Sequence, residues 1–223
     1  MSHDPVDADS DLDAGPFSAW LDEMQGAIGG DNDADVPCGT CTACCTASQF
    51  IDIAPEESDA LAHIPSALLF PAPGAPRGHV LMGYDERGHC PMLVDGGCSI
   101  YEHRPRTCRT YDCRVFAAGD VVDDDVTKHQ IAARASRWRF DLTSPTDRTA
   151  LAAVRAAAGA LDEHADELPD HVAPHTATQR AVLAVEIHDV FLERNDGDAA
   201  PTVIDPGPDA VLVAVELRRG RRG

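Results

Sequence analysis

Every cysteine of the 223-residue chain lies in two stretches, CGTCTACC at residues 38–45 and CPMLVDGGCSIYEHRPRTCRTYDC at residues 90–113. Thiolates at such density are typical of zinc and iron–sulfur sites. A disulfide scaffold needs an oxidising compartment, and the acidic N-terminus does not resemble an export signal. We therefore expect metal ligation rather than disulfides or inert buried thiols. The predicted ligands are Cys38, Cys41, Cys44, Cys45, Cys90, Cys98, Cys108 and Cys113.

The first stretch has the spacing of a metal-binding turn. Two residues separate Cys38 from Cys41, which is the span of a tight turn that lets two thiolates converge on one centre. The adjacent Cys44 and Cys45 should point in different directions. One of them then serves a second centre, binds another iron of a cluster, or stays unligated.

The start of the second stretch predicts a β-hairpin. Asp95-Gly96-Gly97 reads as a three-residue turn that places Val94 opposite Cys98. In a regular strand Cys90 would lie about 13 Å further along the same face. Either the chain bends at Pro91, or Cys90 and Cys98 serve different centres.

A short helix is expected after the hairpin, because proline at position 105 suits a first helical turn. It would place Cys108 near a helix N-terminus, where backbone N–H groups favour a thiolate over a thiol. Three nearby arginines, Arg104, Arg106 and Arg109, would act in the same direction. The alternative is that they form salt bridges with neighbouring acidic residues.

The spacing leaves the metal open. Four thiolates suit tetrahedral zinc and also a [4Fe–4S] cluster, so eight could make two sites, or one site with spare cysteines. Neither the ferredoxin nor the radical-SAM spacing is present. His79, His89 and His103 could each replace a thiolate, but with enough cysteines present we expect surface or hydrogen-bonding roles.

Together, CGTCTACC and GHCPMLVDGGCSIYEHRPRTCRTYDC (residues 88–113) resemble the YkgJ-type cysteine-cluster family, a zinc- or iron-chelating CxxCxxCC domain. The run C-x-I-Y-x-x-R-P-x-x-C-R-x-Y-x-C, from Cys98 to Cys113, is its most specific part. The resemblance covers residues 36–116 and implies that all eight cysteines match the ligand pattern. The family is also similar to the cysteine-rich part of flagellin lysine N-methylases, which favours an iron–sulfur cluster over zinc.

Outside this module, composition divides the chain. The acidic leader, residues 1–35, has ten acidic residues and no Lys or Arg, and is expected to be largely disordered around a short helix near 17–28. Residues 36–116 should form a small α+β module of short strands and helices, with a strand in 49–53, a helix to His63, a loop over 68–78 and a strand in 79–85. Residues 218–223 are expected to be a solvated basic tail.

Residues 117–217 should be mainly helical and end in a short strand pair. Ser144-Pro145-Thr146-Asp147 is a helix start signal, and apolar residues follow at intervals of three and four. A second apolar stripe runs through residues 183–191. These stripes should pack inside the fold, the alternative being a protein partner or a dimer face. The β-branched run at residues 210–217 is expected to be a buried strand paired with 203–204.

Charge and missing motifs restrict the function. With 38 acidic and 18 basic residues the formal charge is −20, which disfavours binding to nucleic acid. No apolar stretch could span a membrane, so a cytoplasmic location is expected. Nucleotide-binding loops, a nucleophile elbow and zinc-protease motifs are missing, and no catalytic residue can be named.

The sequence thus predicts an α+β metal-binding protein that holds an iron–sulfur cluster, of the [4Fe–4S] type, or zinc. One alternative is an enzyme related to the flagellin methylases, acting in methyl transfer or redox chemistry. Another is a thiol-based sensor or interaction module that uses Cys44 or Cys45.

Overall fold

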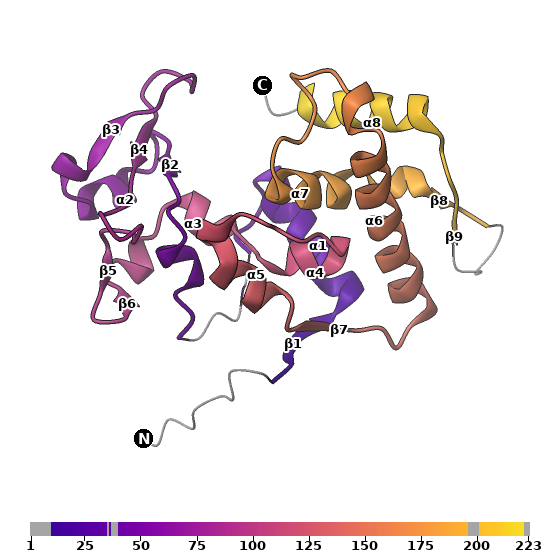
Figure 1. Cartoon of the computed structure of the whole chain (residues 1–223), viewed down its shortest axis with the longest axis horizontal. Helices are drawn as coiled ribbons and strands as arrows, with labels where there is room; N and C mark the ends of the chain where they lie inside the picture. The colour runs from indigo at the N-terminus through magenta and orange to yellow at the C-terminus, as the bar shows by residue number, and fades with distance from the viewer. Residues whose placement is uncertain (1–9, 35, 37–39, 196–200, 221–223) are drawn as a thin grey trace. The chain divides into compact units, whose positions relative to one another are not determined.

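The computed structural model describes residues 10–34, 36, 40–195 and 201–220 (Figure 1). The chain forms two compact units, each built from separated stretches. Unit 1 comprises residues 1–25, 113–123 and 134–223, and unit 2 comprises residues 26–112 and 124–133. Two helices, α1 (Phe17–Gly29) and α5 (His129–Ala135), run across unit boundaries. No helix in the described part of the chain is both long and apolar enough to cross a bilayer.

Unit 1 is mainly helical, as expected for the C-terminal half. Its remaining elements are β1 (Leu12–Pro16), α4 (Arg114–Gly119), β7 (Trp138–Asp141), α6 (Pro145–Glu163), η5 (Ala165–Glu167), α7 (Ala177–Ile187), η6 (His188–Phe191), β8 (Leu192–Glu193), β9 (Thr202–Val203) and α8 (Pro208–Gly220). Helices α4, α6 and α7 pack together. Alanines such as Ala153, Ala157 and Ala181 are fully buried, which allows the helices to approach closely.

The start of α6 confirms the predicted signal. The Ser144 hydroxyl accepts a hydrogen bond from the Asp147 N–H at 2.9 Å, and the Asp147 carboxylate accepts one from the Ser144 N–H at 3.3 Å. This capping box satisfies backbone donors that the first helical turn leaves unpaired. The Asp147 carboxylate also accepts from the Ser18 N–H at 3.0 Å, which ties α6 to α1.

Two predictions for unit 1 are wrong. The run 210–217 lies in helix α8, because Pro208 starts a helix and the buried residues, Val211, Ala214 and Val215, follow a helical spacing. The expected strand pair is therefore absent, and β9 pairs with β8 instead. Of the expected solvated tail, residues 218–220 end α8, where Arg218 forms an ion pair with Asp189 at 3.0 Å, and residues 221–223 lie outside the described residues.

A parallel strand pair was not expected in unit 1. Strand β1 pairs with β7, with Leu12 opposite Trp138, within regions predicted as disordered leader and as helix. Expected disorder is thus wrong for residues 12–16, where β1 forms, and the expected helix near 17–28 is confirmed as α1. Residues 1–9 and 35 of the leader lie outside the described residues.

Unit 2 consists of short elements. They are η1 (Ala43–Thr46), β2 (Ile51–Ile53), α2 (Ser58–His63), η2 (Ser66–Leu68), β3 (Leu69–Pro71), β4 (Val80–Met82), β5 (Leu93–Val94), β6 (Gly97–Cys98), η3 (Tyr101–His103), α3 (Arg106–Thr110) and η4 (Val126–Lys128). Strands β2, β4 and β3 form an antiparallel sheet in that order. A core cluster of Ile53, Ile64, Met82 and Ile100 packs beside it.

The α+β class is confirmed, and unit 2 agrees with most of the expected elements. Strands β2 and β4 and helix α2 lie where they were predicted. The expected loop over 68–78 is wrong at its start, because Leu69–Pro71 forms β3 and pairs with β4. Pairing with β4 stabilises this strand. A three-residue segment carries too little local sequence signal to predict it.

Candidate metal centre

Four cysteines of unit 2 lie close enough to influence one another electrostatically. Cys45, Cys90 and Cys98 all act on Cys108, and Cys98 also acts on Cys90. We call Cys45, Cys90, Cys98 and Cys108 the thiol quartet. Its members come from η1, from the turn before the hairpin, from β6 and from α3. The fold thus gathers thiols from both cysteine-rich stretches.

Backbone pairing joins Cys45 to Cys90. The Cys90 N–H donates to the Cys45 carbonyl at 2.7 Å, and the Ser48 N–H donates to the Gly88 carbonyl at 2.9 Å. Gly88 has a φ of +79°, and a Cβ built there would lie 2.2 Å from the Ser48 hydroxyl oxygen. Only glycine therefore allows these two segments to approach each other in this way.

A turn ahead of the hairpin brings Cys90 towards Cys98. The Leu93 N–H donates to the Cys90 carbonyl at 2.9 Å, so the chain bends over Pro91 and Met92 before β5 begins. This bend is one of the two expected solutions, and it removes the expected separation of about 13 Å along a regular strand. Cys90 and Cys98 both pack against the core cluster of unit 2.

The hairpin register differs from the predicted one. Leu93, rather than Val94, lies opposite Cys98, and Gly97 pairs with Val94. Asp95 and Gly96 form a two-residue turn with φ values of 50° and 78°. Two successive positive φ angles are typical of a type I′ turn, a favoured two-residue connection in β-hairpins, so the expected three-residue turn is wrong.

Helix α3 holds Cys108 as predicted, and side chains of neighbouring elements anchor that helix. The Glu57 carboxylate accepts hydrogen bonds from the N–H groups of Ala54 and Arg106. The Thr107 hydroxyl donates to the Asp52 carbonyl at 2.7 Å. These bonds fix α3 against β2 and α2, and so fix Cys108.

The expected thiolate at Cys108 is wrong for the chain without metal. Burial raises the pKa of the Cys108 thiol to about 12, and Cys90, Cys45 and Cys98 add to the rise. Arg104 lowers this pKa, but by less than burial raises it. Burial also raises the pKa of Cys90. A bound cation would supply the positive charge that these thiolates need.

The other predicted ligands are not members of the thiol quartet. Cys41 is half-buried and Cys44 is exposed, while Cys38 lies outside the described residues. Cys113 belongs to unit 1, where it is buried and accepts a hydrogen bond from the Trp138 indole N–H at 3.2 Å. None of the seven described cysteines is in a disulfide.

Arginines and histidines near the cysteines have specific partners. The Arg109 guanidinium pairs with Asp33 at 3.1 Å, and the Arg106 guanidinium donates to the Ala27 carbonyl at 3.1 Å. Among the histidines, His79 pairs with Asp52, as expected for a hydrogen-bonding role. His103 belongs to a group with Asp59 and His63 that sequence analysis missed, although the i, i+4 spacing of Asp59 and His63 was a visible signal.

Comparison with protein families identifies the segment that contains this centre. Residues 37–134 match the model of the CxxCxxCC family, described as a "putative zinc- or iron-chelating domain". This segment is similar to a CxxCxxCC domain. Searches of curated proteins and of solved structures found no match. The CxxCxxCC domain spans the thiol quartet, and its description agrees with the predicted metal binding.

Proposed function

We propose that the CxxCxxCC domain binds a [4Fe–4S] cluster through the thiol quartet, with a single zinc ion as the competing occupant. The observation that carries the proposal is that three thiols from three other segments, those of Cys45, Cys90 and Cys98, lie near the half-buried Cys108. Four thiolates complete the ligand set of either centre. Cys38, Cys41, Cys44 and Cys113 stay predicted ligands of the same or a second centre.

The spacing of the thiols favours the larger centre. Four sulfurs bound to one zinc ion at about 2.3 Å would lie roughly 3.8 Å from one another. Among the described residues, no three cysteine sulfurs lie within 4.8 Å of one another. A [4Fe–4S] cluster places each thiolate on a different iron, so it accepts sulfurs that are further apart.

The metal centre should also stabilise unit 2. Metal binding contributes to folding when the unfolded chain has no preformed site. The quartet joins η1, the hairpin and α3, and of its four cysteines only Cys90 and Cys98 pack against the core cluster. A centre bound to all four segments would cross-link them. We therefore propose a structural role for the metal, to which a redox role can be added if the centre is reducible.

Metal and sulfide analysis of protein purified without oxygen tests this proposal. A [4Fe–4S] cluster requires iron and acid-labile sulfide in equal amounts, about four of each, together with a brown colour. A colourless protein with stoichiometric zinc would replace the cluster by the zinc alternative. Protein with neither metal would overturn the proposal.

Two serine variants then test the ligand set. Cys108→Ser should lose most of the bound metal, because Cys108 lies at the centre of the quartet. Cys113→Ser should retain it if the quartet is sufficient, since a serine hydroxyl can still accept the Trp138 hydrogen bond. Loss of metal from both variants would instead support the larger predicted ligand set, and full metal content in Cys108→Ser would contradict the quartet.

A further inference from the structure

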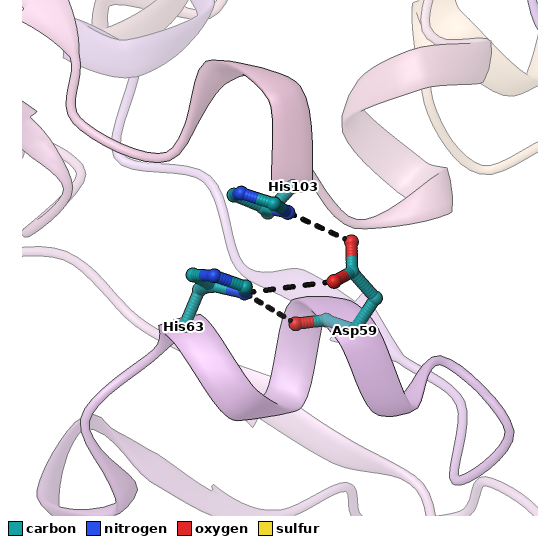
Figure 2. A group of neighbouring side chains, drawn as sticks. All are labelled: Asp59, His63 and His103. Carbon is teal, nitrogen blue, oxygen red and sulfur yellow. Dashed lines mark hydrogen bonds and ion pairs between the residues drawn. The ribbon is translucent and has the colours of Figure 1, made fainter.

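Two imidazoles and a carboxylate meet on one side of unit 2, from α2 and η3 (Figure 2). The His103 Nδ1 lies 2.9 Å from the Asp59 Oδ2, and the His63 Nδ1 lies 3.7 Å from the Asp59 Oδ1. One ligand atom from each residue lies within 4.8 Å of the other two. None of these residues belongs to the cysteine pattern of the domain.

Local structure explains why the three side chains converge. Asp59 and His63 are four residues apart in α2, which places them on one face of the helix. His103 ends η3, and its ring stacks on that of His63 with 3.5 Å between ring centroids and 4° between planes. The stacking holds both Nδ1 atoms towards Asp59, as Figure 2 shows.

The hydrogen bonds define where the protons are. The His63 Nδ1 lies 2.9 Å from the Asp59 backbone carbonyl, which can only accept, so this nitrogen carries a proton. The hydrogen bond from His103 lowers the pKa of the Asp59 carboxyl, so Asp59 is ionised at neutral pH and the His103 Nδ1 donates to it. Both Nδ1 atoms that face Asp59 therefore carry a proton.

We propose that Asp59, His63 and His103 bind a divalent transition-metal ion such as Zn²⁺, at a site separate from the thiol quartet. The ion would take the place of the two Nδ1 protons, and each neutral imidazole would keep one proton by moving it to Nε2. Zinc binds histidine nitrogen and carboxylate oxygen at about 2.0–2.2 Å, so ligand atoms around one ion lie roughly 3–3.6 Å apart. The distances from the His103 Nδ1 to the Asp59 Oδ2 and from the His63 Nδ1 to the Asp59 Oδ1, 2.9 and 3.7 Å, are close to this range.

The donor set fixes the class of ion. Two imidazoles and one carboxylate suit zinc and its transition-metal neighbours rather than calcium or magnesium, which prefer oxygen ligands. Three protein ligands leave a coordination position for water. The side chains of Asp59, His63 and His103 are 69%, 42% and 38% exposed, so an ion and its water can enter without a structural change. Arg109 also acts on Asp59 and would weaken the binding of a cation.

Zinc titration of the protein with its thiol centre already loaded tests this inference. We expect one additional equivalent of Zn²⁺ to bind by calorimetry, without loss of the metal already present. In nitrogen-15 spectra of the imidazoles, the Nδ1 resonances of His63 and His103 should shift together, and those of His79 should not. Absence of an additional equivalent, or shifts spread evenly over all histidines, would overturn the site.

Substitutions separate the site from general binding at surface histidines. Removing one of three ligands in His103→Ala or His63→Ala should weaken zinc binding by at least about tenfold. His79→Gln is the matched control, because His79 also pairs with a carboxylate of unit 2, at 3.0 Å. Equal losses in His79→Gln and His103→Ala would contradict the proposal. The metal content of the thiol centre should stay unchanged in all three variants, which distinguishes failure of this site from failure of the proposed function.

Discussion

The two units are stabilised in different ways. Unit 1 buries long helices against one another, and side chains such as Val154, Leu161 and Ile187 are fully buried. Unit 2 has short elements and a core cluster of Ile53, Ile64, Met82 and Ile100, and its segments are joined by bonds such as Thr107 to Asp52. Burial of apolar surface is the main favourable term in folding, so unit 2 has more need of a metal centre than unit 1.

Metal removal should therefore produce the largest difference in stability between the two units. Chelation of the thiol-bound metal should destabilise unit 2 by several kcal/mol, since structural zinc contributes roughly 10–16 kcal/mol in small zinc domains. Hydrogen exchange should show lost protection at the backbone N–H groups of Cys90, Leu93 and Cys108, which donate within unit 2. Amides of α6 and α7 should stay protected. Equal loss of protection in both units would show that unit 2 depends on the metal no more than unit 1 does.

A smaller effect is expected from the turn beside Cys90. Gly88→Ala places a side chain at a φ of +79° and against the Ser48 hydroxyl, which should cost about 1–3 kcal/mol. Gly97→Ala is the control, because a Cβ at Gly97 meets no atom within 4 Å. Urea unfolding of the metal-loaded protein measures both. If the two variants are equally stable, the close approach of the segments around Cys45 and Cys90 is not a determinant of unit 2.

The smallest expected effect is a loss of stability of unit 1 at low pH. Hydrogen bonds from Ser144 and Ser18 lower the pKa of Asp147 from 3.8 to about 2. A carboxyl with a lowered folded-state pKa stabilises the fold above pH 3.8, and this contribution is lost as the pH falls towards 2. Asp147→Asn should remove that part of the pH dependence and cost about 1 kcal/mol at neutral pH, as helix caps do.

Thermal unfolding from pH 2 to 5 checks this prediction. The quantity compared is the difference in melting temperature between Asp147→Asn and the wild type. Asp170→Asn, at an exposed carboxyl of the same unit, is the control. An unchanged difference between Asp147→Asn and wild type over this range would contradict the role of the capping box.

What could be predicted from sequence depended on how local the signal was. The start of α6 is encoded within four residues, from Ser144 to Asp147, and was predicted correctly. Strands β1 and β7 define each other across more than a hundred residues, so neither had a local signal. The apolar run at 210–217 allows both strand and helix, and Pro208 decides for the helix.

The candidate metal centre shows the same limit. Density and spacing predicted that the cysteines are ligands, but not which thiols come together. That choice depends on the bend at Pro91 and Met92 and on a hairpin register shifted by one residue. Only part of the group of Asp59, His63 and His103 could be predicted. Asp59 and His63 share a helix, whereas His103 lies far from both along the chain.

The interrupted connectivity of unit 1 has a consequence for biosynthesis. Unit 2 is complete once residue 133 has been made, whereas α6, α7 and α8 of unit 1 follow later in the chain. A ribosome that adds about 5–20 residues per second leaves an interval of several seconds between the two events. During that interval the helices of unit 1 are still incomplete, while the cysteines of unit 2 are already available for metal insertion.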